Sequence, residues 1–134
     1  PGFSAVLDTS GLEPGRHYRL CLWPDRHDVT SGFHDAAQAV YVTGIRTTNF
    51  ASLSAGPAQS FSFDCPEGCS GSSSVYLGSA CDHTDFSGAH LAEAGLSTDA
   101  APVSHSAGDT YATTLDATGL SPGPYNLCAD LDGA

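Results

Sequence analysis

The chain has 134 residues, of which 40% are hydrophobic and only 14% are charged, enough for one domain with a real core. Its net charge of −11, with four Lys and Arg in total, argues against the basic surface needed to bind nucleic acid or an anionic membrane. No apolar run approaches the roughly 20 residues of a membrane-spanning helix, so membrane insertion is not expected.

The first third of the chain reads as strands separated by a polar loop. Strand patterns of alternating apolar residues are interrupted by clusters of Gly, Pro, Ser and Asp. We expect the end of a strand at 3–8, a strand at 16–23, a loop at 24–36 and a last strand at 37–43.

The remaining residues continue the β pattern, with the clearest alternation in AQSFSFDC. No helical periodicity is sustained, which predicts an all-β class. We expect strands at 45–53, 58–65, 74–81, 109–116 and 124–131, and a loop-rich segment at 82–108 with a short helical stretch at 88–94.

An internal repeat is the strongest feature of the sequence. Residues 7–21 read LDTSGLEPGRHYRLC, and residues 115–128 read LDATGLSPGPYNLC. Nine positions are identical: Leu7/Leu115, Asp8/Asp116, Gly11/Gly119, Leu12/Leu120, Pro14/Pro122, Gly15/Gly123, Tyr18/Tyr125, Leu20/Leu127 and Cys21/Cys128. The spacing, near 107 residues, is about the length of one immunoglobulin-like sandwich.

Each copy of the repeat predicts a corner between two strands. In G-L-x-P-G, Pro fixes φ and Gly supplies turn conformations. We expect Tyr18 and Tyr125 to be corner tyrosines that open an F-type strand. The chain is then an immunoglobulin-like β-sandwich in two parts: residues 1–43 are the C-terminal E-F-G strands of a first module, and residues 44–134 are a second module lacking its last strand.

Five cysteines without metal-site spacing predict disulfides in an oxidising compartment. The preferred pairing is Cys65–Cys69 and Cys81–Cys128, although four cysteines allow three pairings and the sequence does not choose between them. Alternation along the strands turns Cys128 away from the core. Cys21, the counterpart of Cys128, is expected to pair outside the chain.

Ile45 to Leu53, Gly56, the Phe61–Phe63 strand and the G-L-x-P-G-x-Y corner resemble IPT/TIG-type immunoglobulin-like domains. The Ser, Ala, Gly and Cys richness is similar to that of modules in fibrous surface proteins of algae, including mastigoneme-type filament proteins. The resemblance implies a structural module of an extracellular filament or surface array that self-associates, carries glycans and has no catalytic residues. The alternatives are an adhesin or carbohydrate-binding module, or a pilus-like subunit assembled by donor-strand exchange.

Candidate sites outside the repeat are few. The candidate O-glycan acceptors are Thr47, Thr48, Ser70, Ser72, Ser73 and Ser74. Trp23 and Tyr41 are expected on an outward face, where packing against a neighbouring module is favoured over sugar binding.

No enzymatic function or cofactor is expected, because the sequence contains no nucleophile elbow, P-loop or H-E-x-x-H motif. His83 lies in a Cys-Asp-His-Thr-Asp stretch that is read as a solvated loop rather than a metal site. Asp130-x-Asp132-Gly133 matches the start of a calcium loop without its twelfth-position ligand. Calcium at a module junction is therefore only the alternative.

Overall fold

The computed structural model describes residues 4, 6–23, 32–50, 52–81 and 90–131. This part of the chain is all-β, as predicted, and its strands pair in antiparallel fashion. The strands are β1 (Arg16–Leu22), β2 (His34–Val42), β3 (Thr47–Thr48), β4 (Gln59–Asp64), β5 (Ser74–Gly78), β6 (Ala101–Ala107), β7 (Thr110–Leu115) and β8 (Asn126–Asp130).

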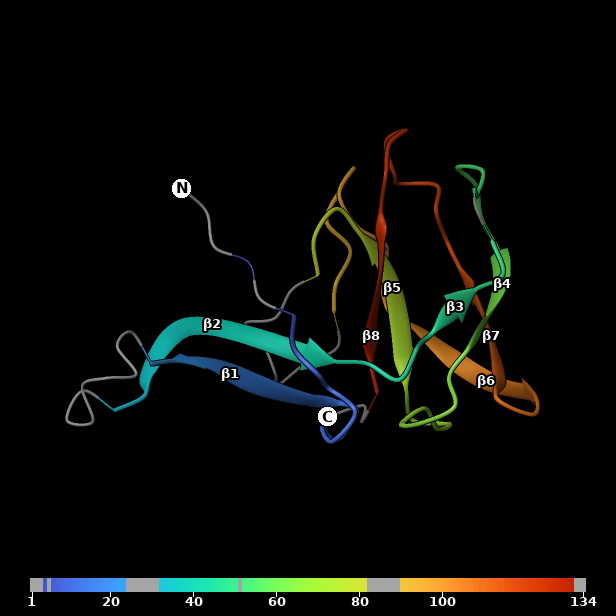
Figure 1. Ribbon diagram of the computed structural model, residues 1–134. Coiled ribbons are helices and arrows are strands. Elements are labelled where there is room, and N and C mark those ends of the chain that lie inside the picture. The colour runs from blue at the N-terminus through green and yellow to red at the C-terminus, as the bar shows by residue number, and fades with distance from the viewer. Residues whose placement is uncertain (1–3, 5, 24–31, 51, 82–89, 132–134) are drawn as a thin grey trace.

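The strands form two separate sheets (Figure 1). β1 and β2 make a two-stranded sheet, called here the N-terminal hairpin. The other six pair in the order β3-β4-β7-β6-β5-β8. This six-stranded sheet bends at β6, which pairs with β7 over most of its length but with β5 only at Ala101 and Pro102, so that two layers face each other as a sandwich.

The sandwich core lies between the β4/β7/β6 layer and the β5/β8 layer. Alternation in β4 buries Phe61 and Phe63 and leaves the adjacent Ser60 and Ser62 less buried, as a half-buried strand requires. The buried cluster consists of Phe61, Phe63, Cys65, Val75, Leu77, Ala101, Val103, Leu115 and Ala117. The Phe50 ring packs on the Phe61 ring with centroids 4.2 Å apart. This contact connects the segment after β3 to the core.

Several expectations about elements are wrong. The described residues of 3–8 are not a strand, since Val6 and Leu7 are exposed and unpaired with any strand. The strand expected at 45–53 is reduced to β3. The segment expected to be loop-rich contains β6, a seven-residue strand.

The described part of the helical stretch expected at 88–94 is residues 90–94, which form no helix. β2 begins at His34, three residues earlier than expected. None of the described residues belongs to a helix with the length and apolarity needed to cross a bilayer.

Candidate functional site

The two copies of the repeat fold into the same turn. In the first, the Ser10 amide donates to Asp8 Oδ1 (3.0 Å). In the second, the Thr118 amide donates to Asp116 Oδ1 (2.8 Å). The following backbone bonds are equivalent as well: Leu12 N to Thr9 O and Leu120 N to Ala117 O. The sequence repeat is therefore also a repeat of local structure.

Each turn is followed by a tyrosine whose hydroxyl returns to the backbone of the turn. The Tyr18 hydroxyl accepts a hydrogen bond from the Glu13 amide (2.8 Å). The Tyr125 hydroxyl lies 2.6 Å from the carbonyl oxygen of Ser121 and 2.9 Å from that of Gly95. Glu13 and Ser121 occupy the same position of the repeat, so both tyrosines have the geometry expected of a tyrosine corner.

The carboxylates of Asp8 and Asp116, one in each turn, both have a lowered pKa. Hydrogen bonds from the amide and then the hydroxyl of Ser10 hold the pKa of Asp8 below its ordinary value of 3.8. The hydroxyl and then the amide of Thr118 lower the pKa of Asp116 in the same way. Both turns therefore favour the charged aspartate.

The surroundings of the two corners differ. Pro14 and Gly15 are half-buried, whereas their counterparts Pro122 and Gly123 are exposed. A Cβ on Gly15 would lie 3.3 Å from Cβ of Leu131, at the end of β8. A Cβ on Gly123 would meet no atom within 4 Å. The first corner thus packs against the sandwich, and the second faces open space.

The N-terminal hairpin meets the sandwich at a surface, called here the junction, formed by Pro14, Gly15, Tyr41, Gly44, Glu67, Gly68 and Leu131. Gly44 touches the carbonyl of Glu67 so closely that any Cβ would overlap it. Gly68 has φ +86°, and a Cβ there would lie 2.8 Å from Cβ of Pro14. The absence of a side chain at these two glycines therefore permits close approach across the junction, to the Glu67 backbone at Gly44 and to the Pro14 ring at Gly68.

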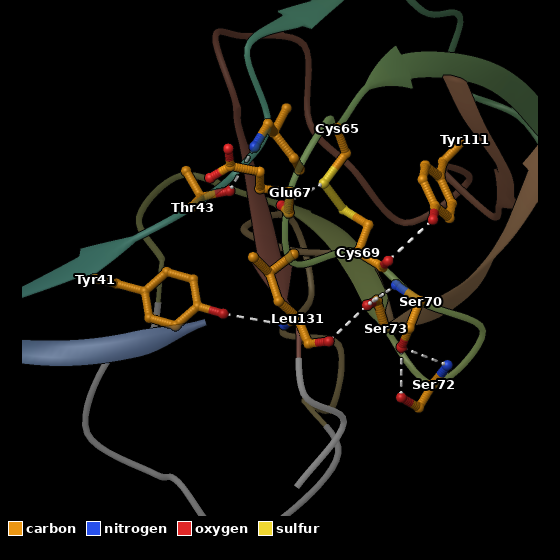
Figure 2. The surroundings of a disulfide bond; sticks show 11 residues. Tyr41, Thr43, Cys65, Glu67, Cys69, Ser70, Ser72, Ser73, Tyr111 and Leu131 are labelled. Carbon is orange, nitrogen blue, oxygen red and sulfur yellow. Dashed lines mark hydrogen bonds between the residues drawn. A yellow bond between two sulfur atoms is a disulfide. The ribbon is translucent and has the colours of Figure 1, made fainter. Parts of the chain in front are cut away.

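A hydrogen bond also crosses the junction (Figure 2). The Leu131 amide donates to the Tyr41 hydroxyl (3.0 Å), and the Leu131 carbonyl accepts from the buried Ser73 hydroxyl (2.6 Å). Tyr41 therefore contacts the sandwich, the packing that the sequence favoured for it. Leu131 is fixed from the hairpin on one side and from the sandwich on the other.

The loop that faces Gly44 is closed by a disulfide between Cys65 and Cys69. Cys65 is buried in the core cluster, and the carbonyl of Cys69 accepts a hydrogen bond from the Tyr111 hydroxyl (2.9 Å) (Figure 2). The loop is thus fixed by the core and by β7. The part of the junction that belongs to the sandwich is therefore held in place.

A second disulfide joins Cys81, just after β5, to Cys128 in β8. Both disulfides follow the pairing that the sequence favoured. Cys128 is buried outside the central apolar cluster, in register with Tyr76 of the neighbouring strand. Cys21, its counterpart in the repeat, is an exposed free thiol in β1.

The candidate glycan positions divide by exposure. Thr47, Thr48, Ser70 and Ser72 are exposed, and Ser74 is half-buried. Ser73 is only 1% exposed, and its hydroxyl bonds to Leu131. The prediction of Ser73 as an O-glycan acceptor is therefore wrong for the folded chain, because neither an enzyme nor a sugar would have access to its hydroxyl oxygen.

Sequence reasoning missed Gly44, Gly68 and Leu131 as junction residues. The only available signal was a glycine directly after a predicted strand and another inside the short C-P-E-G-C loop. His83, Asp132 and Gly133 lie outside the described residues. Within the described ranges, no three His, Cys, Asp or Glu side chains gather as a metal site.

Comparisons with protein-family models, with curated proteins and with solved structures find no match for this chain.

Proposed function

We propose that the chain is a structural module of an extracellular filament or surface array, built from repeated immunoglobulin-like sandwiches and without catalytic activity. In this proposal the N-terminal hairpin is the F and G strands of one module. β3, β4, β5, β6, β7 and β8 are the A, B, C, D, E and F strands of the next. Modules of this kind associate with further copies, and exposed hydroxyls such as Thr47 and Thr48 carry the glycans.

The junction is the observation that carries this proposal. A corner of the repeat, Pro14–Gly15, packs on Gly68 and Leu131 of the following sandwich. The Tyr41 hydroxyl adds a directional bond to the same place. Backbone contact at Gly44 leaves little freedom for one part to rotate against the other. A fixed relation between neighbouring modules is what a regular fibre requires.

Two further features fit the proposal, one its extracellular setting and the other its solubility. The disulfides Cys65–Cys69 and Cys81–Cys128 persist in oxidising compartments. The chain also has a net charge of −11, which favours solubility through repulsion. Donor-strand exchange between subunits is an alternative route to the same filament, because it would use the same strand positions.

Negative-stain electron microscopy of native, non-reduced material tests the proposal. Regular fibres with an axial repeat of one sandwich length are the expected result. Dispersed single particles at all protein concentrations would contradict it. Reduction of the same material is the second condition, because it opens the disulfides but leaves peptide connections between modules intact. The fibres should then persist with a less regular axial repeat.

A carbohydrate-binding role is the second candidate, and one observation favours it. Trp23 and Phe33 lie at the end of the hairpin where β1 and β2 are connected, with ring centroids 5.3 Å apart, and both are exposed (39% and 71%). Exposed aromatic rings stack on sugar faces. A glycan array with and without calcium tests this role, and loss of binding in Trp23→Ala against unchanged binding in Tyr111→Phe would assign it to this pair.

A further inference from the structure

At the end of the six-stranded sheet, the edge of β8 over 126–129 is not paired with any strand in the described part of the chain. β8 bonds to β5 from Asn126 to Asp130, and none of the described strands pairs with its other edge. An open edge carries unpaired backbone donors and acceptors and is a template for another strand. Leu127 and Ala129 on this strand pack against the core, so a strand added here would lie directly beside the core.

An apolar groove lies at the start of the same strand. It has a volume of about 420 Å³ and runs between residues 50 and 52–55 on one side and residues 117 and 120–125 on the other. Its walls include Phe50, Leu53, Leu77, Leu120 and Tyr125. The exposed corner Pro122–Gly123 forms part of its rim. The groove and the open edge meet at Tyr125, so one extended segment could cover both.

The chain itself contains a template for that segment. β1 and β8 are equivalent in the repeat, since Tyr18 and Cys21 match Tyr125 and Cys128. In the N-terminal hairpin β2 covers the corresponding edge of β1, with Arg16 opposite Val42 and Tyr18 opposite Val40. The end of β2 also secures the corner, because the Gly15 amide donates to the Val42 carbonyl (2.8 Å).

Transferring this pairing to the second copy fixes a register. The second corner has one residue fewer between its glycine and its tyrosine than the first. Counted back from Tyr125, position 40 of a β2-like strand would face Tyr125, and position 42 would face Gly123. Opposite residues of an antiparallel pair point to the same face of the sheet. Tyr125 packs against the core. The valines at positions 40 and 42 would therefore point into the groove rather than to solvent.

We propose that the free edge of β8 and the apolar groove together bind one strand whose sequence resembles that of β2. This strand would run antiparallel to β8 and place two valines in the groove. The inference rests on the repeated-module organisation proposed above and names its binding surface. The occupant is an extended segment with small or β-branched side chains at alternate positions, ending in a turn that carries the next sandwich.

The test appends a second copy of residues 28–43 directly after Ala134. This point preserves the spacing, because residues 128–134 then correspond to residues 21–27 of the first copy. Two results are expected from the full chain. The thermal midpoint should rise by about 5 °C or more. Hydrogen exchange should slow at least about tenfold at the Gly123 amide and at those β8 amides that do not bond to β5.

The matched control carries Val40→Asp and Val42→Asp in the appended copy only, which leaves the original hairpin intact. It should show neither effect, because a carboxylate in the groove would lose its hydration. Unchanged exchange at β8 and Gly123 in the valine version overturns the proposal, as does equal slowing in the aspartate version.

If the extended chain does not fold, a free peptide of residues 33–43 at millimolar concentration replaces it. Failure of the peptide to slow exchange at β8 in the unmodified chain then overturns the inference. These outcomes are separate from electron microscopy of native material. Fibres without binding of the added strand would contradict the strand-binding inference alone. Binding of the added strand without fibres would contradict the proposed filament function alone.

Discussion

The backbone amide of Leu131, directly after β8, donates a hydrogen bond to the hydroxyl of Tyr41, which lies 90 residues earlier in the sequence, in β2 of the N-terminal hairpin. This is a direct polar link between the N-terminal hairpin and the sandwich. Since Leu131 also bonds to Ser73, the same residue connects the hairpin to the sandwich interior.

Replacing Tyr41 by Phe should weaken the junction without disturbing the sandwich. The variant keeps the ring and removes only the acceptor oxygen, which costs about 1 kcal/mol. We expect the Leu131 amide to exchange about fivefold faster, as measured by nuclear magnetic resonance. Tyr111→Phe is the control, because its hydroxyl bonds to Cys69 within the sandwich. Equal acceleration at Leu131 in both variants would argue that the Tyr41 bond has no specific role.

Gly44→Ala should destabilise the junction by about 1–3 kcal/mol, because the new methyl group meets the Glu67 carbonyl and backbone lies on both sides. Limited proteolysis of the 43–45 segment should become faster. Gly71→Ala is the matched control, since a Cβ at that position meets no atom within 4 Å. The control should stay within about 0.5 kcal/mol of the unmodified chain. A harmless Gly44→Ala would mean that the junction is not tightly packed in solution.

The two disulfides should differ in their effect on the free energy of unfolding. Cys81–Cys128 closes a loop with a separation of 47 residues, whereas Cys65–Cys69 spans only four. From loop-closure entropy, removing the first by paired Cys→Ala substitution should cost about 4 kcal/mol and removing the second about 2 kcal/mol. Urea denaturation of both variants measures the ratio. A larger loss for the short loop would show that packing of Cys65 in the core outweighs chain entropy.

The free thiol gives a prediction about assembly. In the isolated chain a thiol reagent should modify Cys21 alone, because it is exposed and the other four cysteines are in disulfides. In native filament material Cys21 should be protected by the disulfide that the repeat assigns to it, the counterpart of Cys81–Cys128. Mass spectrometry after non-reducing digestion distinguishes the two states. A freely reactive Cys21 in intact fibres would contradict the proposed equivalence of the modules.

The corner turns should respond to acid. The pKa values of Asp8 and Asp116 are held below 3.8 by hydrogen bonds to the charged form. Such carboxylates stabilise the fold above their unfolded pKa, and this contribution is lost as the pH falls through the lower, folded pKa. We expect the Ser10 and Thr118 amide resonances to shift together below about pH 4. Asp116→Asn should abolish the shift at Thr118 only, because its amide oxygen still accepts the bond but does not titrate.

The sequence predicted those parts of the fold that depend on local pattern. The strict alternation of Phe61 and Phe63 identified β4, and the Gly-Pro corners located the starts of β1 and β8. β6 was missed because a proline follows its first residue and because only Ala101 and Val103 are buried in it. The rest of that strand consists of Pro102, Ser104, His105, Ser106 and Ala107, so no periodic apolar signal remains.

The 45–53 region failed for a different reason. Ile45, Phe50 and Leu53 pack against the core, which explains their apolar character. Among the described residues of this region, only Thr47 and Thr48 join the ladder of backbone pairs. In this region the sequence therefore predicts which side chains are buried, but it does not predict which residues pair with a neighbouring strand. The junction was beyond prediction because contact between Gly44 and Glu67, or between Gly68 and Pro14, depends on how two sheets meet.

The Cys81–Cys128 bond has a mechanical consequence. A pulling force applied to the two ends of the chain passes through this bond and bypasses the segment between the two cysteines. At about 3.4 Å per extended residue, roughly 160 Å of contour length is withheld from extension. A sandwich that unfolds under tension would therefore lengthen only by the residues outside the Cys81–Cys128 loop. The residues inside this loop would not extend until the disulfide was reduced.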